Sequence, residues 1–170
     1  MQQMPDGNSI RGTIAIATIA YAAAEWLRVR RSPAWRSARA LWTIGALSLA
    51  VHALAAFHYR YAWSHTQAIQ ATAAETAAVT GLDSGAGLYV NYAFLSLWIA
   101  DAAWWWLAPA SYAARRRALS LTVSAIFLFM VLNGAVVFAQ GAMRWLGTAC
   151  VLTVCAAFVR GVRPTARSRT

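Results

Sequence analysis

Three histidines in the first half of the chain are the first candidates for metal or cofactor chemistry: His52, His58 and His65. His58 and His65 are seven residues apart, so a continuous helix places them on one face, about 10 Å apart. One metal ion cannot bridge that distance unless the helix breaks between them. A site could still form if Glu75, Asp83 or Tyr89 folded back onto His58 or His65. The metal candidates are therefore His58, His65 and Glu75. The alternative is that both histidines bond to the backbone or to lipid headgroups at a membrane surface.

His52 lies inside an apolar stretch, where polar side chains are costly and turn toward other helices. Asn91, Tyr92 and Asn133 are expected at a similar depth, so the four side chains predict a polar cluster. Two interpretations of His52 stay open: a structural hydrogen-bond network, or the axial ligand of a bound haem or chlorin. No other apolar stretch contains a histidine, which excludes a haem held by two histidines of this one chain.

Two carboxylates, Asp101 and Glu25, fall near the ends of apolar stretches. A carboxylate at such a depth must pair, take up a proton or face water. Nearby arginines have long side chains that can reach both groups. Ion pairing that fixes helices together is one interpretation, and a proton or ion pathway through Asp101 is the other.

Other chemistry is excluded by what the sequence lacks. It contains no lysine, so no retinal or pyridoxal Schiff base and no P-loop lysine can form. It has no G-x-S-x-G and no H-E-x-x-H motif. Cys150 and Cys155 are five residues apart, and a helix places them on different faces, which predicts neither a disulfide nor a redox pair.

The composition identifies the environment of these residues. Hydrophobic residues make up 60% of the chain and charged residues 12%, and the mean hydropathy is +0.47. Soluble domains are about 45–50% apolar and about 25% charged. The chain is therefore expected to be an all-α integral membrane protein, a single membrane domain over residues 1–170. Five stretches approach the length of about 20 apolar residues that a span requires: residues 10–27, 40–57, 87–108, 118–140 and 143–159.

The arginines predict the orientation of these spans. Twelve of the 15 fall between spans one and two, between spans three and four, or after span five, and three fall on the other side. Positive residues are retained in the cytoplasm. This places the N-terminus outside, the C-terminus inside, and the basic tail 160–170 in the cytoplasm. The alternative is that the first span is a signal peptide cleaved after Ala20-Tyr21-Ala22, but cleavage would export the five arginines that follow.

The outer connection, residues 58–86, is the longest in the chain. Ser64 can cap a helix that Gly81 ends, and this helix either continues span two or lies on the membrane. A tight turn is expected at Gly141, and Pro109 is expected to end the third span. Tryptophans near the span ends predict interfacial belts. On the cytoplasmic side these are Trp26, Trp42 and the triplet Trp104–Trp106. At least one ring of the triplet should face a neighbouring helix.

The sequence thus favours a small multi-pass protein of a bacterial inner (plasma) membrane. Its expected role is a non-enzymatic accessory or assembly subunit of a larger membrane complex. The alternatives are a haem- or metal-binding redox protein using His52 or His58 with His65, and a proton-coupled carrier or channel using Asp101. The expected partners are the lipid bilayer and other membrane subunits, and not nucleic acid. No cofactor is required by the sequence.

Overall fold

The structure is a computed structural model that describes residues 6–29 and 35–162. Its elements in chain order are α1 (Asp6–Val29), α2 (Trp35–Tyr59), α3 (His65–Thr80), α4 (Gly87–Leu107), α5 (Pro109–Ala113), α6 (Arg117–Leu132), the π-helical turn η1 (Asn133–Val137) and α7 (Ala142–Val162). These described residues contain no strand, so the predicted all-α class is confirmed.

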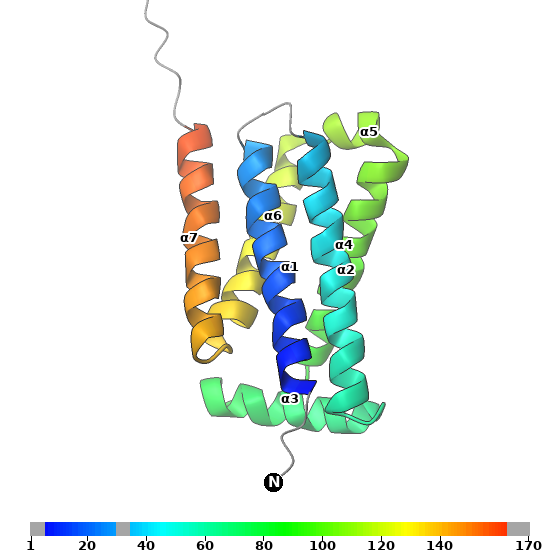
Figure 1. Cartoon of the computed structure of the whole chain (residues 1–170), viewed down its shortest axis with the longest axis vertical. Helices are drawn as coiled ribbons and strands as arrows, with labels where there is room; N and C mark the ends of the chain where they lie inside the picture. Colours follow the sequence, from blue (N-terminus) through cyan, green and yellow to red (C-terminus); the bar gives the residue numbers. More distant parts are fainter. Residues whose placement is uncertain (1–5, 30–34, 163–170) are drawn as a thin grey trace, which may run out of the picture.

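The long helices lie side by side and alternate in direction along the chain (Figure 1). α1 packs against both α2 and α7, α2 packs against α4, and α7 packs against α6 and η1. The short helix α5 lies at one end of this bundle, and α3 crosses the opposite end.

Three helical segments are long and apolar enough to cross a membrane: α2, the continuous segment Arg117–Val137, and α7 over Ala142–Arg160. This supports a membrane protein but does not reach the predicted count of five. α4 is also 21 residues long and contains four tryptophans, two tyrosines and Asp101, but it is not one of these three segments. α1 carries charged residues near both of its ends, among them Arg11, Glu25 and Arg28.

The long connection between α2 and α4 forms the predicted helix, and it turns away from α2. Ala62 and Trp63 have positive φ values of 44° and 60°, which break the helical path between α2 and α3. Ser64 caps α3, and its side chain accepts a hydrogen bond from the Gln67 backbone N–H. Gly81 ends the helix in the left-handed conformation with φ 77°. The helix therefore lies across the end of the bundle and does not extend α2 (Figure 1).

The fourth long helix differs from the expected continuous span over residues 118–140. It widens into η1 and ends at Val137, and Gly141 makes the tight turn with φ 59°. η1 brings the Ala135 carbonyl so close to Gly147 of α7 that no side chain fits at that position. This places α7 firmly against the end of the fourth helix.

Four helices each contribute one aromatic ring to the centre of the bundle: Tyr21, Trp42, Trp98 and Phe127. All four are at most 2% exposed. The Phe127 ring centroid lies 4.6 Å from that of Trp42 and 5.1 Å from that of Trp98. The predicted interfacial position was thus wrong for Trp42, whose indole is fully buried among rings of other helices. Of the tryptophan triplet, Trp105 is buried and Trp106 is half exposed, as expected for a segment that faces both a neighbour and the surroundings.

Candidate functional site

The side chain of Asp101 is the centre of a buried polar site at the α5 end of the bundle. Its Oδ1 atom accepts a hydrogen bond from Arg115 Nη1 at 2.9 Å, and its Oδ2 atom accepts one from the Tyr112 hydroxyl at 2.8 Å. The Asp101 and Arg115 side chains are 4% and 5% exposed. Both carboxylate oxygens therefore have charged or polar donors in a buried setting. The arginine that reaches Asp101 is Arg115, which lies between α5 and α6.

The α4–α5 corner positions the two donors. α4 ends before Pro109, which begins α5 and directs the chain back over the end of α4. The Tyr112 ring consequently stacks on Trp105, with 4.7 Å between centroids and 8° between planes. The Arg115 guanidinium lies 4.1 Å from the Tyr112 ring centroid, and its Nε donates to Ser120 Oγ at 2.8 Å. Arg115 is thus held from α4, α5 and α6 together.

Tyr112 and Ser120 were missed by the sequence analysis. Their distances from Asp101 in the chain match no motif, and only the reversal at Pro109 brings Tyr112 back to α4. Burial raises the pKa of the Tyr112 phenol above its ordinary value of 10.0. The hydroxyl therefore remains a proton donor to Asp101 at neutral pH.

A second ion pair lies at the same end of the bundle, on α1. Glu25 is 2% exposed, and its Oε1 accepts a hydrogen bond from Arg28 Nη1 at 2.8 Å. The Arg28 guanidinium also lies 4.9 Å from the Trp42 ring centroid and 5.3 Å from that of Trp105. Glu25 thus pairs with an arginine of its own helix, so this ion pair does not itself join two helices. The ring contacts of Arg28 connect α1 to α2 and α4.

His52, Asn91, Tyr92 and Asn133, the predicted polar cluster, have contacts in different places. His52 Nδ1 lies 3.0 Å from the Ile10 carbonyl oxygen and 3.4 Å from Thr13 Oγ1, both on α1. The Asn133 amide donates to the Phe129 carbonyl of its own helix, and the Tyr92 ring stacks on His65. Asn91 is exposed. The described contacts of His52 thus join α2 to α1 and do not join it to the other three side chains.

The metal candidates, at the α3 end of the bundle, also have other partners. His58 Nδ1 accepts a hydrogen bond from Trp63 Nε1 at 3.3 Å. His65 contacts the rings of Tyr89 and Tyr92, and Glu75 pairs with Arg60 at 3.2 Å. Within residues 6–29 and 35–162, no three His, Cys, Asp or Glu side chains are grouped so that they could hold a metal ion. Cys150 and Cys155 are both free.

Comparison of the chain with models of protein families, with curated proteins and with solved structures gives no match. The functional argument therefore depends on the geometry alone.

Proposed function

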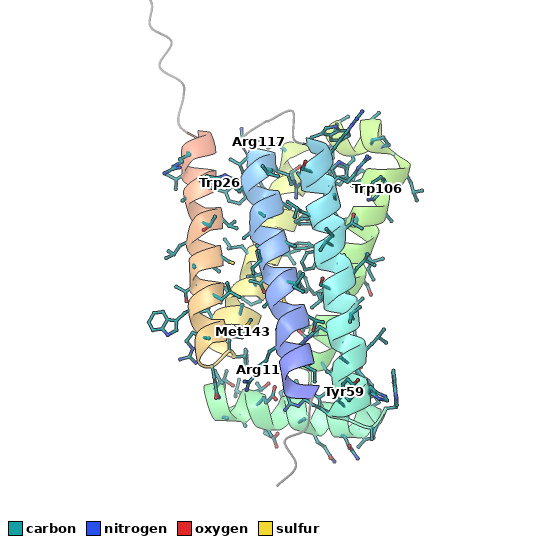
Figure 2. All side chains as sticks on the ribbon, in the orientation of Figure 1. Arg11, Trp26, Tyr59, Trp106, Arg117 and Met143 are labelled. Carbon is teal, nitrogen blue, oxygen red and sulfur yellow. The ribbon has the colours of Figure 1, made fainter. Side chains whose placement is uncertain are left out.

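We propose that the protein crosses a bacterial inner (plasma) membrane five times, with spans near residues 10–27, 40–57, 87–108, 118–140 and 143–159. The support is the separation of residue types along the bundle. Trp26, Trp106 and Arg117 lie at the α5 end, and Tyr59 lies at the α3 end (Figure 2). The α5 end holds seven of the ten arginines of the described residues and is the cytoplasmic end in this proposal: Arg28, Arg36, Arg39, Arg115, Arg116, Arg117 and Arg160. Reporter fusions at Ala113 and Arg163 test it, because both must report the cytoplasm.

For the role of the protein, we infer a non-enzymatic accessory or assembly subunit of a larger membrane complex. The observation that carries this inference is the pairing of Asp101 with Arg115 and Tyr112. A carboxylate with both oxygens occupied, held by three helices, fixes the shape of the bundle. It is not positioned to exchange protons with a substrate. The buried polar groups of the site thus support a scaffold.

The surface of α4 that faces away from the rest of the bundle offers a place where such a scaffold could contact another helix. Small side chains on this surface follow one face at spacings of three, four and three residues, and all are exposed: Ala93, Ser96, Ala100 and Ala103. Helices in lipid associate through small residues because the backbones can then approach closely. This face supports a contact between α4 and another membrane subunit.

The experiment is mild detergent extraction of the tagged chain from its native membrane, followed by sizing under native conditions. We expect an assembly heavier than the monomer, with other polypeptides in fixed stoichiometry. Ala100→Leu should release most of the chain from this assembly, because the larger side chain separates the helix backbones. The matched control is Leu152→Phe, which enlarges an exposed apolar residue on α7 (63% exposed) and should leave the assembly intact. A wild-type chain that is monomeric in every mild detergent would overturn the proposal.

A further inference from the structure

Arg39, in the second turn of α2, lies between two tryptophan rings. Its guanidinium carbon is 3.8 Å from the ring centroid of Trp106 on α4 and 5.3 Å from that of Trp35 on its own helix. Both indoles attract the guanidinium through their ring faces. The side chain is therefore held in one place at the α5 end of the bundle, where Figure 2 shows Trp106.

A closed set of hydrogen bonds fixes this arrangement. The Thr43 hydroxyl donates to the Arg39 carbonyl oxygen at 3.0 Å and accepts from Trp106 Nε1 at 2.8 Å. Arg39 Nη1 also donates to the Trp105 carbonyl oxygen at 3.4 Å. Thr43 thus holds the indole on which the guanidinium rests. A ligand that binds here meets an arginine that is already ordered, which lowers the entropic cost of binding.

The guanidinium has no carboxylate partner among the described residues. The ion pairs over residues 6–29 and 35–162 are Glu25–Arg28, Glu75–Arg60 and Asp101–Arg115. Of the five N–H donors of a guanidinium, Arg39 uses one on an acceptor in this part of the chain. Arg36, exposed and one turn away on the same helix, adds a second positive charge. Arg39 Nε is buried without an acceptor, so the site offers fixed positive charge and the unpaired N–H groups of Nη1 and Nη2, which suits a phosphate group.

The neighbouring surface is apolar. Trp35 is 41% exposed and Trp106 is 50% exposed, so the indoles border the surroundings of the bundle. Farther into the bundle, Leu47 follows Arg39 by eight residues on α2, and Ile99 precedes Trp106 by seven on α4. Both side chains are exposed. These spacings place Leu47 on the same side of α2 as Arg39, and Ile99 on the same side of α4 as Trp106. A phosphate at Arg39 would thus continue into an apolar surface that an acyl chain can follow.

We propose that Arg39, Trp35 and Trp106 form a binding site for the phosphate of an anionic phospholipid in the cytoplasmic leaflet. The leaflet rests on the proposed topology, whereas the chemistry of the site does not. Basic sites between helices on the cytoplasmic side are a common way of binding anionic headgroups. Bound lipid would join α2 to α4 at the membrane surface.

The test is a lipid titration of the full-length chain in detergent, with bound lipid counted by native mass spectrometry. The two lipids are phosphatidylglycerol and phosphatidylcholine with the same acyl chains. We expect the first phosphatidylglycerol to bind about tenfold more tightly than phosphatidylcholine, because both lipids carry the phosphate but only phosphatidylcholine carries a choline cation, which Arg36 and Arg39 repel. Arg39→Gln should remove this preference. The matched control is Arg160→Gln. Arg160 is exposed, and its guanidinium carbon lies 5.6 Å from the ring centroid of one tryptophan, Trp26. This variant should keep the preference for phosphatidylglycerol.

A second variant keeps the test decisive if Arg39→Gln does not fold. Thr43→Val leaves the charge of Arg39 in place but removes the acceptor that holds Trp106, and it should weaken phosphatidylglycerol binding by a factor of about three or more. Equal binding of the two lipids to the wild type, or undiminished binding to Thr43→Val, would overturn the proposal. Soluble glycerol phosphate that competes at the lipid's own concentration would overturn it as well, because the site would then be one for free phosphate esters. Reporter fusions that reverse the topology would change the leaflet and leave these results unaffected.

Discussion

Arg115 Nη1 lies 2.9 Å from Asp101 Oδ1, and both side chains are almost completely buried although 14 residues separate them in the chain. The pair closes the α4–α5–α6 corner, and Tyr112 occupies the second carboxylate oxygen from the same corner. A buried pair of this kind costs solvation to form, but removal of one partner costs more, because it leaves the other charge buried and alone.

Arg115→Gln is therefore expected to destabilise the protein strongly, by about 3–5 kcal/mol, the usual cost of breaking a buried ion pair. Thermal unfolding of the detergent-solubilised protein, followed by circular dichroism, measures the effect. Arg116→Gln is the matched control: Arg116 is exposed, adjacent, and absent from the ion pairs of the described residues. Equal melting temperatures for the two variants would contradict the role assigned to Arg115.

Tyr112→Phe tests the second donor to Asp101. It removes the hydroxyl and keeps the ring that stacks on Trp105, so a loss of about 1.5–3 kcal/mol is expected for a hydrogen bond to a charged group. The loss should depend on pH. Burial raises the pKa of the folded Tyr112 phenol above 10.0, so above about pH 10 the unfolded chain releases a proton that the folded chain retains. The stability contributed by Tyr112 is thus complete below that pH and decreases above it. The melting-temperature difference between wild type and Tyr112→Phe should be smaller at pH 11 than at pH 8; a constant difference would argue against a raised pKa.

Asp101→Asn separates a structural carboxylate from a proton pathway. The amide cannot form the ion pair with Arg115, so the variant should unfold at a lower temperature. Proton flux into liposomes should nevertheless equal that of the wild type, because the native carboxylate is already paired at both oxygens. A wild-type flux that Asp101→Asn abolishes, at a temperature where the variant is folded, would favour the carrier interpretation.

The helices were predictable where local chemistry determines them. The Ser64 cap, the left-handed Gly81, the turn at Gly141 and the helix end before Pro109 each depend on a few neighbouring residues. The π-helical turn η1 was not predicted, although Asn133 and Gly134 interrupt the apolar pattern of residues 118–140 where the turn begins. Its cause lies in packing between helices, since the turn aligns Ala135 with Gly147 of α7.

The candidate site was predictable in type but not in its members. Asp101 and Glu25 each lie within an apolar stretch, where a carboxylate needs a partner, and nearby arginines were available to both. The choice of Arg115 and the addition of Tyr112 depend on the direction in which α5 turns. Trp42 was misplaced for a related reason: an indole near a helix end fits both a headgroup layer and a core. Only the arrangement of Tyr21, Trp98 and Phe127 around it shows that it belongs to the core.

Gly147→Ala should destabilise the contact between α7 and η1. A Cβ atom at this position would overlap the backbone carbonyl of Ala135, which cannot move without shifting the turn. Overpacking of this kind costs about 1–3 kcal/mol. The matched control is Gly12→Ala on α1, where a Cβ meets nothing within 4 Å and alanine favours the helix. Thermal unfolding should show a lower melting temperature for Gly147→Ala and an unchanged or higher one for Gly12→Ala. The reverse order would mean that η1 does not pack on α7 in this way.

The purified protein is expected to be colourless and to contain no stoichiometric metal. His58 Nδ1 is occupied by Trp63 and Glu75 by Arg60, so a metal bound at these residues would have to displace existing contacts. The hydrogen bond between His52 Nδ1 and the Ile10 carbonyl leaves Nε2 as the atom through which His52 would hold a haem. An absorption spectrum of the protein extracted gently from its native membrane tests for haem or chlorin, and elemental analysis tests for zinc, copper and iron. A Soret band that His52→Ala removes, or one equivalent of metal that His58→Ala and His65→Ala both release, would favour the redox interpretation. In that case the outer end of α2 would have to rearrange around the ligand, because a metal bound at His58 Nδ1 replaces the hydrogen bond from Trp63 that now holds the turn into α3.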